Sequence, residues 1–338
     1  MKLQDLEKFR DNEGFIDFDK ILKLYEKGLI DGFQEGLPET RGSAEKFKHW
    51  FELEDCDILA RSTMFTDEIA TYTEYAELIT EELAKQVEIP CAHYDLIKVN
   101  GINGNLSVNI IEDEDRQSLT ALSQNQASLE VMKGSTIDEV IEKINYFSVT
   151  QGIERDSIKS INRELIKRVI FDIYTMQTDR HLGNISLLYD GDELKLSPLY
   201  DNECSLMLDK TKSDIDDILK SEDKDKKIKI YASLQEGCIN LDDEDRTIDS
   251  AGWEDMLYFL CDEPGYARDF AKECSTKLNI DKAIENVEKR IGAEIPKQAK
   301  EFATLGFNQR KESIENALML DIDVEMEGFD NDDDEYPI

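Results

Sequence analysis

The chain has 338 residues, 40% of them hydrophobic, so it can form a sizeable core as one large domain or as two lobes. Its formal net charge of −36 repels nucleic-acid phosphates and anionic lipid, which argues against a role on DNA or on a membrane surface. A surface of this charge favours a basic partner, although solubility or a salt-adapted host explains it equally well.

The amino terminus, MKLQDLEKFRDNEGF, is charged and lacks the apolar stretch of a secretory signal. No apolar run approaches the roughly 20 residues that span a bilayer. The six cysteines are scattered without a Cys-x-x-Cys pair, which argues against a zinc site and against a disulfide framework. We therefore expect a cytoplasmic protein with reduced thiols.

The first part of the chain is predicted to be rich in strands. Residues 1–35 begin with short helices, because Leu3, Leu6 and Phe9 follow helical spacing. Residues 67–88 carry an apolar stripe among acidic residues and predict a helix, with Pro90 shortly after its end. Apolar or alternating runs predict strands at 56–60, 93–99, 106–111 and 128–135.

Helices are predicted to dominate from Thr136 onward. Residues 160–177 place Leu165, Val169 and Ile173 on one face and suit a central core helix. ISLLYD and ELKLSP then predict a small hairpin around the turn at Asp190 and Gly191. Residues 209–249 are rich in Asp and Lys and predict an exposed insertion, and the acidic end of the chain predicts a mobile tail.

This order of elements predicts an α+β fold with two lobes and a cleft between them. We place the strand-rich amino-terminal lobe at residues 1–135. The mostly helical carboxy-terminal lobe follows at 136–320, and the acidic tail occupies 321–338.

Two carboxylates and an amide follow the long predicted helix. Asp179 and Asn184 are separated by four residues, and Asp201 comes after the small hairpin. In phosphoryl transfer, one carboxylate orients the attacking hydroxyl, while an amide oxygen and a second carboxylate hold magnesium on the nucleotide phosphates. The hairpin can return Asp201 to the end where Asp179 and Asn184 lie, so the spacing predicts a phosphate-handling site. A helix-terminating Asp179, a turn Asn184 and a strand-end Asp201 are the purely structural alternatives.

The complete string is more specific than the spacing. TDRHLGN (178–184) followed by LSPLYDNECSL (196–206) resembles the HipA-like kinase family, in which a T-D-R-H-x-x-N loop precedes an L-x-P-x-Y-D segment. The resemblance covers roughly residues 38–320 and is strongest at 160–207. It implies a two-lobed protein-kinase-like fold that transfers the γ-phosphoryl group of ATP to serine or threonine with the help of Mg²⁺.

The resemblance also assigns roles within this string. Asp179 would be the catalytic carboxylate, and Asn184 and Asp201 would be the magnesium ligands. Arg180 and His181 would brace the loop rather than react, because phosphoryl transfer of this kind does not need an imidazole.

Further nucleotide-binding residues are implied upstream. TRGSAEKFKHW (40–50) resembles the family's loop over the nucleotide phosphates, where Gly42 allows close approach of the backbone and Ser43 can donate to phosphate. A plain turn explains the same residues nearly as well. Since a serine in this loop is a regulatory phosphorylation site in some relatives, Ser43 is also a candidate for modification.

Two other positions match the family less specifically. Glu74 matches the glutamate that pairs with a strand lysine, although a solvated acidic helix face is an equal explanation. The hinge segment LEVMKG (129–134) could present the backbone groups of Glu130 and Met132 to adenine, and Met132 is equally suited to the core.

The sequence departs from the family where a strand lysine should hold the α- and β-phosphates. CDILARST offers Ala60 or Arg61 there, and the forked guanidinium of arginine is not equivalent to an ammonium. Lys46 or Lys48 from the preceding loop could take the role instead. Glu203 and Cys204 also replace a small Gly-Ser pair after the second carboxylate, which puts the metal geometry in question.

We therefore predict a serine/threonine protein kinase capable of autophosphorylation, with a pseudokinase that acts as a nucleotide-binding interaction module as the alternative. A lipid kinase is a third reading, against which the acidity of the chain argues. The expected substrate is an unidentified, basic protein. If the protein is toxin-like, as the family's best-known members are, we expect a separately encoded helix-turn-helix partner and no direct contact of this chain with nucleic acid.

Overall fold

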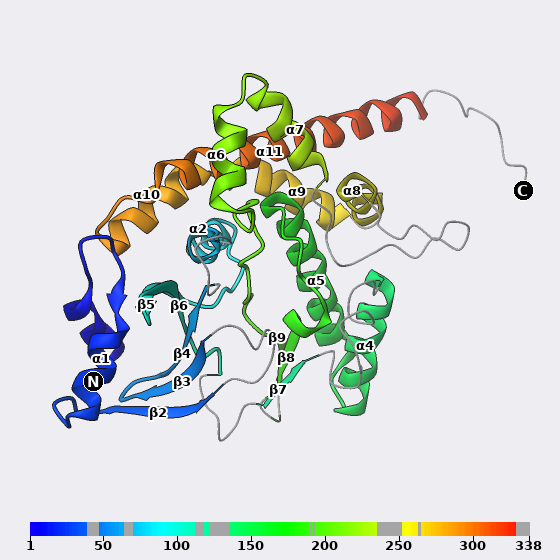
Figure 1. Cartoon of the computed structure of the whole chain (residues 1–338). Helices are drawn as coiled ribbons and strands as arrows, with labels where there is room; N and C mark the ends of the chain where they lie inside the picture. Colours follow the sequence, from blue (N-terminus) through cyan, green and yellow to red (C-terminus); the bar gives the residue numbers. More distant parts are fainter. Residues whose placement is uncertain are drawn as a thin grey trace, which may run out of the picture.

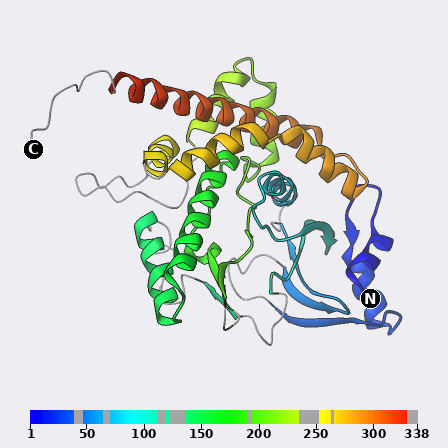
Figure 2. The same ribbon diagram turned by 180° about the vertical axis from the view of Figure 1, so that it is seen from behind.

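The computed structural model folds into two lobes that lie side by side, one built on a β-sheet and one mostly helical (Figure 1). The long helix α11 (Lys297–Gly328) crosses the top of the helical lobe, and α10 (Ile280–Ile291) packs beside it over the sheet lobe (Figures 1 and 2). The structure describes residues 1–38, 47–63, 70–111, 118–121, 136–189, 191, 193–234, 252–262 and 265–328.

Within these ranges, six strands form the sheet of the first lobe in the order β1-β5-β6-β4-β3-β2. Strand β1 is parallel to β5, and the other neighbours are antiparallel. The predicted hairpin at 93–99 and 106–111 corresponds to β5 and β6. The strands are β1 (Ile16–Asp17), β2 (Phe33–Pro38), β3 (Lys48–Leu53), β4 (Asp57–Ser62), β5 (Tyr94–Val99) and β6 (Ile102–Val108).

Aromatic packing fixes the outer part of this sheet to the first helices of the chain, η1 (Leu3–Phe9) and α1 (Phe18–Glu26). The ring centroids of Phe18 and Phe51 lie 4.9 Å apart, and those of Phe33 and Phe51 lie 5.1 Å apart. All three side chains are buried, so α1 covers one face of β2 and β3.

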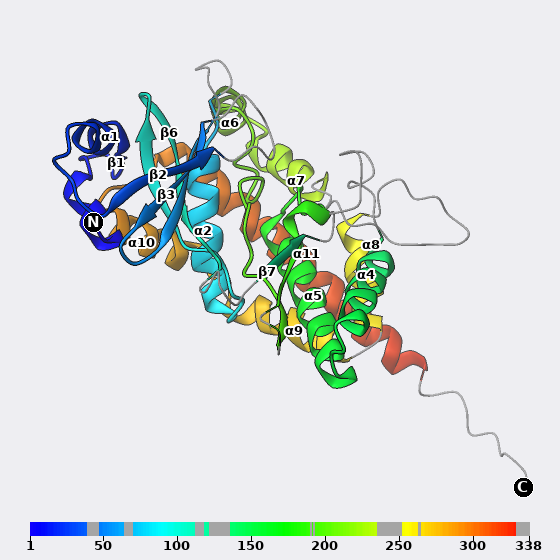
Figure 3. The ribbon, with the colours of Figure 1, turned by 90° about the horizontal axis from the view of Figure 1, so that it is seen from below.

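Helix α2 (Thr73–Gln86) lies between the sheet and α10 (Figures 1 and 3). Every residue from Thr73 to Ala84 is buried, including four glutamates. Because α2 is enclosed on all sides, its position is set by elements of both lobes, among them β5, β6 and α10.

The centre of the second lobe is α5 (Arg155–Thr175), which confirms the predicted core helix. Strands β8 (Ser186–Tyr189) and β9 (Leu194–Leu196) form the predicted small hairpin, and β7 (Ser118–Ala121) adds to its edge. The remaining helices around α5 and α11 are η3 (Leu182–Asn184), α4 (Ile137–Thr150), α6 (Lys212–Lys220), α7 (Lys224–Leu234), α8 (Trp253–Asp262) and α9 (Gly265–Lys277).

Two expectations need correction. Residues 212–234 of the predicted exposed insertion form α6 and α7, which pack on α11 through the buried Ile215, Ile218 and Ile228. Their apolar spacing was hidden by the many surrounding charges. Helix α11 continues to Gly328, past the predicted start of the tail at 321.

Strand β7 lies within the predicted first lobe of residues 1–135 and pairs with β8. None of the helices in the described ranges combines the length and apolar character that a membrane crossing requires.

Candidate active site

The candidate catalytic loop, which carries Asp179 and Asn184, begins where α5 ends. The helix stops at Thr175 because Met176 adopts a left-handed conformation with φ of 55°. The next turn is closed by its own groups: the carbonyl of Asp179 accepts hydrogen bonds from the His181 N–H at 2.9 Å and from Asn184 Nδ2 at 2.8 Å. Because its nitrogen donates to this carbonyl, Asn184 has its amide oxygen available as a ligand.

Asp201 returns to this loop through Gln177. The buried amide of Gln177 accepts from the Asp179 N–H at 2.9 Å and donates to the Asp201 carbonyl at 3.1 Å. A single side chain thus ties the backbones of both aspartates together, although they are separated by the hairpin β8–β9. About a third of each carboxylate side chain is exposed, 33% for Asp179 and 30% for Asp201, so both remain accessible.

The backbone of Asp201 is also held from the first lobe. Its φ of 60° lies in the left-handed region, and its N–H donates to the hydroxyl of Tyr94 at 2.9 Å. Tyr94 begins β5 and is buried, so its hydroxyl reaches across from the sheet to the carboxylate-bearing loop. Asp201 therefore joins the two lobes.

Arg61 on β4 lies at the centre of the site. Its Nη1 donates to Asp201 Oδ1 at 2.6 Å, and its Nη2 donates to Glu77 Oε1 on α2. Burial opposes the charge of the guanidinium, but the carboxylates of Glu77 and Asp201 outweigh it and raise the pKa of Arg61 above its ordinary value.

For Glu77 burial acts in the other direction and raises the pKa of its carboxyl to about 7; Asp201 and Glu203 add to this effect, while Arg61 opposes it. Arginine stays protonated in proteins, so Glu77 is the member of the pair that titrates. The backbone N–H of Asn202 donates to the second oxygen of Glu77 at 2.8 Å.

The prediction that Glu74 pairs with the strand cation is wrong, because Glu77 takes that position. Glu74 lies about one turn earlier on α2, where Asn103 Nδ2 donates to its Oε1 at 3.4 Å; among the described residues its Oε2 has no hydrogen-bond partner. Its burial raises the pKa of this carboxyl. Both glutamates are buried, so their exposure does not tell which of them contacts Arg61. The difference is the side of α2 from which each side chain projects, because only the side of Glu77 faces Arg61.

Arg180 braces the loop, as predicted. Its Nε and Nη2 donate to the two carboxylate oxygens of Asp172 at 3.0 and 3.1 Å. Nη2 also donates to Asn202 Oδ1 at 2.7 Å, and Nη1 donates to the Tyr200 carbonyl at 2.6 Å. His181 accepts from the Gly183 N–H through Nδ1 at 3.0 Å, while its Nε2 lies 4.0 Å from Asp179 Oδ2. Both residues therefore shape the loop.

Several predicted residues lie outside the described ranges: Gly42, Ser43, Lys46, Glu130 and Met132. Lys48 is described and pairs with Arg61 in the register of β3 and β4. Cys204, one of the two positions that depart from the family, lies among acidic groups: burial raises the pKa of its thiol, and the nearby carboxylates of Glu203, Asp179 and Asp209 raise it further.

The donor set suits magnesium bound to a nucleotide. Asn184 and Asp201 are the residues that would supply oxygen ligands, and Mg²⁺ on nucleotides commonly takes one or two protein oxygens with phosphates and water completing its shell. Within the described residues, no group of three or more His, Cys, Asp or Glu side chains is arranged to hold a metal on its own.

Sequence reasoning missed Glu77, Gln177, Tyr94 and Asn202. Gln177 could have been noticed because it directly precedes the TDRHLGN string. Asn202 lies within the quoted LSPLYDNECSL string, directly after Asp201. Glu77 and Tyr94 contribute through contacts between distant elements, which no local pattern in the sequence announces.

Comparisons with known proteins agree with this architecture. The model of the HipA-like C-terminal domain matches residues 44–257. The crystal structure of the Helicobacter pylori proinflammatory kinase CtkA is similar with a TM-score of 0.65 and 15% identity, over 86% of this chain and 97% of that chain. The Shewanella oneidensis MR-1 toxin–antitoxin complex of HipA, HipB and operator DNA is similar with a TM-score of 0.52 and 13% identity, over 89% of this chain and 71% of that chain.

No curated protein matches the sequence significantly. The family model covers more than half of the chain, and both similar structures extend over most of it. The protein therefore belongs to the HipA-like C-terminal domain family and has a two-lobed, kinase-like α+β fold.

Proposed function

We propose that the protein is an ATP- and magnesium-dependent kinase that transfers the γ-phosphoryl group to a serine or threonine hydroxyl of a protein. The observation that carries this proposal is the tie made by Gln177, which holds the backbones of Asp179 and Asp201 together beside Asn184. Two partly exposed carboxylates and an amide oxygen are the groups that phosphoryl transfer requires of a protein.

In this mechanism Asp179 orients the acceptor hydroxyl and takes its proton late in the reaction. The acceptor oxygen bonds to the γ-phosphorus as the bond from that phosphorus to the β-phosphate oxygen breaks, which leaves ADP. Asn184 and Asp201 would hold Mg²⁺, which neutralises charge on the phosphates when bound. Arg61 supplies a fixed positive charge beside Asp201 in place of the strand lysine.

The competing function is a pseudokinase that binds nucleotide and acts as an interaction module. Its support is the engagement of Arg61 by two carboxylates, because a guanidinium held by Glu77 and Asp201 is less available to phosphates than a lysine. The retained Asp179 and Asn184 favour the enzyme.

The substrate we propose is a basic protein, since the net charge of −36 attracts positively charged partners. The similar HipA structure contains HipB and operator DNA, which supports a separately encoded partner for this chain as well. We place the protein in the cytoplasm, in keeping with the ATP that its reaction requires.

Intact-mass spectrometry after incubation with ATP and magnesium tests the function, with Asp179→Asn in parallel. A phosphoryl-sized gain in the wild-type protein that Asp179→Asn lacks supports the kinase, and peptide mapping then identifies the acceptor. Addition of basic test proteins extends the assay to acceptors in trans. No transfer to itself or to these proteins, together with measurable ATP binding, would favour the pseudokinase.

A further inference from the structure

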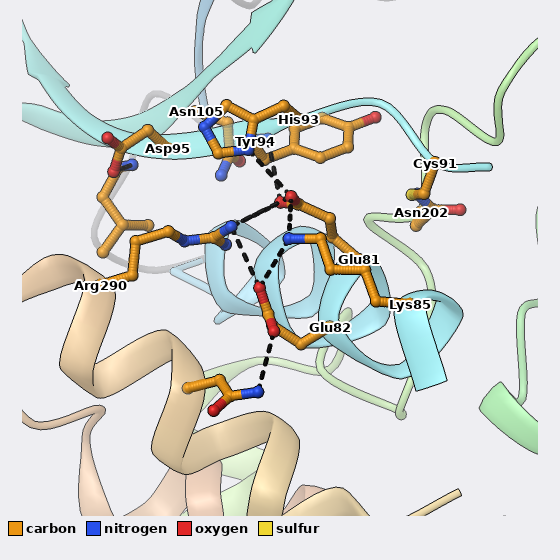
Figure 4. A network of polar contacts seen from close by, with 12 residues as sticks. Glu81, Glu82, Lys85, Cys91, His93, Tyr94, Asp95, Asn105, Asn202 and Arg290 are labelled. Atoms are coloured by element: carbon orange, nitrogen blue, oxygen red, sulfur yellow. Dashed lines mark hydrogen bonds and ion pairs between the residues drawn. The ribbon is translucent and has the colours of Figure 1, made fainter. Parts of the chain in front are cut away.

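Helix α2 carries Glu77, which contacts Arg61 in the candidate site, and the charged end of α10 at Arg290 contacts α2 at Glu81 and Glu82 (Figure 4). Glu81 and Glu82 are 1% and 8% exposed, so water contributes little to the solvation of their carboxylates. They require polar or cationic partners, and the described residues supply these from α2 itself, from His93 directly before β5 and from α10. We call Glu81, Glu82, Lys85, His93 and Arg290 the α2–α10 cluster.

Arg290 is the member of the cluster that comes from α10. Its Nη1 donates to both oxygens of Glu81 at 3.0 Å and to Glu82 Oε1 at 3.3 Å. Lys85 Nζ lies 2.7 Å from Glu81 Oε1 and 2.8 Å from Glu82 Oε1, and His93 Nδ1 lies 2.9 Å from Glu81 Oε1. Lys85 belongs to α2, so it moves with the glutamates; Arg290 instead connects them to another element (Figure 4).

Two further contacts show that α10 runs antiparallel along α2. Asn286 Nδ2 donates to Glu82 Oε2 at 3.1 Å. At the opposite end of α10, Gln86 and Asn279 exchange two hydrogen bonds, of 2.7 Å to Gln86 Oε1 and 3.0 Å to the Asn279 carbonyl. The contacts at Asn279, Asn286 and Arg290 therefore hold α2 along its last two turns.

Two sets of contacts connect the α2–α10 cluster to the candidate active site. Glu77 and Glu81 are four residues apart, so they share a face of α2, and Glu77 binds Arg61. Glu81 Oε2 also accepts from the backbone N–H of Tyr94 at 3.1 Å, and the hydroxyl of the same Tyr94 accepts from the Asp201 N–H. The first set of contacts reaches Arg61 and the second reaches Asp201, and these two residues contact each other.

We propose that Arg290 is a positioning residue for phosphoryl transfer: by binding Glu81 and Glu82 it holds α2 where Glu77 fixes Arg61 beside Asp201. This inference rests on the proposed kinase function and adds to it that the carboxy-terminal α10 helps to set the active arrangement. Small displacements of catalytic groups reduce rates strongly, so a residue outside the site can control the rate through a helix.

The contacts of Arg290 also predict which substitution should preserve the role. All of its hydrogen bonds with the described residues come from Nη1, while Nε and Nη2 have no hydrogen-bond partner. A lysine ammonium can replace a single nitrogen, in contrast to the forked use of Arg61. Arg290→Lys should therefore keep the function that Arg290→Met loses. The matched control is Lys289→Met on the same helix, because Lys289 is exposed.

The experiment measures hydrogen exchange of the α2 amides and steady-state phosphoryl transfer in full-length protein. We expect Arg290→Met to exchange α2 amides at least tenfold faster and to reduce kcat at least tenfold, with α9 amides unchanged. Arg290→Lys and Lys289→Met should stay within about threefold of wild type in both. If Arg290→Met does not fold, Glu82→Gln replaces it, and a smaller change in the same direction is expected because Glu81 remains.

A double-mutant cycle with Arg61→Lys separates positioning from general stability. If Arg290 acts through Glu77 and Arg61, the double variant should lose less activity than the product of the two single losses. Unchanged exchange in Arg290→Met, faster exchange with unchanged kcat, or strictly multiplicative losses would each overturn the proposal. A wild-type protein that transfers no phosphoryl group would instead overturn the proposed function, and with it this role for Arg290.

Discussion

Arg61 and Asp201 lie 140 residues apart in the sequence, and Arg61 Nη1 donates to Asp201 Oδ1 at 2.6 Å. This ion pair joins β4 of the first lobe to the loop after β9 in the second. The same guanidinium binds the buried Glu77, so one arginine connects the sheet, α2 and the proposed metal ligand. The fork of the guanidinium is what allows both contacts.

The first prediction concerns the charge balance of this pair. Arg61→Met should destabilise the protein by about 3–5 kcal/mol, because it leaves the carboxylate of Glu77 buried without a cation. The double variant Arg61→Met with Glu77→Leu should regain most of this stability, since a buried ion pair can be replaced by apolar side chains of similar size. Urea unfolding at pH 8, above the pKa of about 7 for Glu77, measures both free energies.

Nucleotide binding should separate from stability in these variants. The double variant should fold but bind ATP more weakly than wild type by calorimetry, because no charge remains at position 61. A double variant that binds ATP normally would show that another cation, such as Lys48, anchors the phosphates.

The second prediction concerns Gly104, which lies opposite Ser62 in the register of β4 and β6. A Cβ at Gly104 would collide with the Arg61 carbonyl oxygen and lie 2.8 Å from the Ser62 Cα, both of which are backbone atoms. Gly104→Ala should therefore cost about 1–3 kcal/mol and shift Arg61 away from its partners. Gly265→Ala is the control, because a Cβ there meets no atom of the described residues within 4 Å. Equal unfolding free energies for the two variants would contradict this account of the strand spacing.

Local patterns in the sequence were sufficient to predict the elements around the catalytic loop. The apolar spacing of α5, the turn at Gly191 and the TDRHLGN string identified the loop and its hairpin before any contact was known. These features depend on residues close together in the chain, so periodicity and turn chemistry are enough to find them.

The choice between Glu74 and Glu77 could not be made in this way. Every residue of α2 from Thr73 to Ala84 is buried, so the helix has no exposed face against which a pattern could be read. Which glutamate reaches Arg61 depends on the rotation of α2 between β5 and α10, a property of packing alone. Residues 212–234 illustrate the opposite error, because abundant charge concealed the apolar contacts of α6 and α7 with α11.

The third prediction concerns Arg180, whose guanidinium meets Asp172, Asn202 and the Tyr200 carbonyl at once. Arg180→Lys keeps the charge but cannot reach these partners from one nitrogen, so the loop that carries Asp179 should lose its support. We expect kcat to fall at least tenfold, with ATP affinity changed by less than about threefold. Steady-state kinetics and calorimetry measure these values, with Arg155→Lys at the exposed start of α5 as the control. A kcat equal to that of the control would show that Arg180 is dispensable for the loop.

The fourth prediction concerns the pH dependence of stability through Glu81. Burial alone would raise the pKa of this carboxyl, but the contacts with His93, Arg290 and Lys85 outweigh burial and lower the pKa from 4.5 to about 2. The unfolded chain therefore binds this proton at a higher pH than the folded protein does. The stabilisation is complete above about pH 4.5 and is lost as the pH falls toward 2, by about 3 kcal/mol in all. Urea unfolding between pH 3 and 7 should show that Glu81→Gln loses less unfolding free energy on acidification than the wild type does. Equal losses in the two proteins would mean that the pKa of Glu81 is the same in the folded and the unfolded protein.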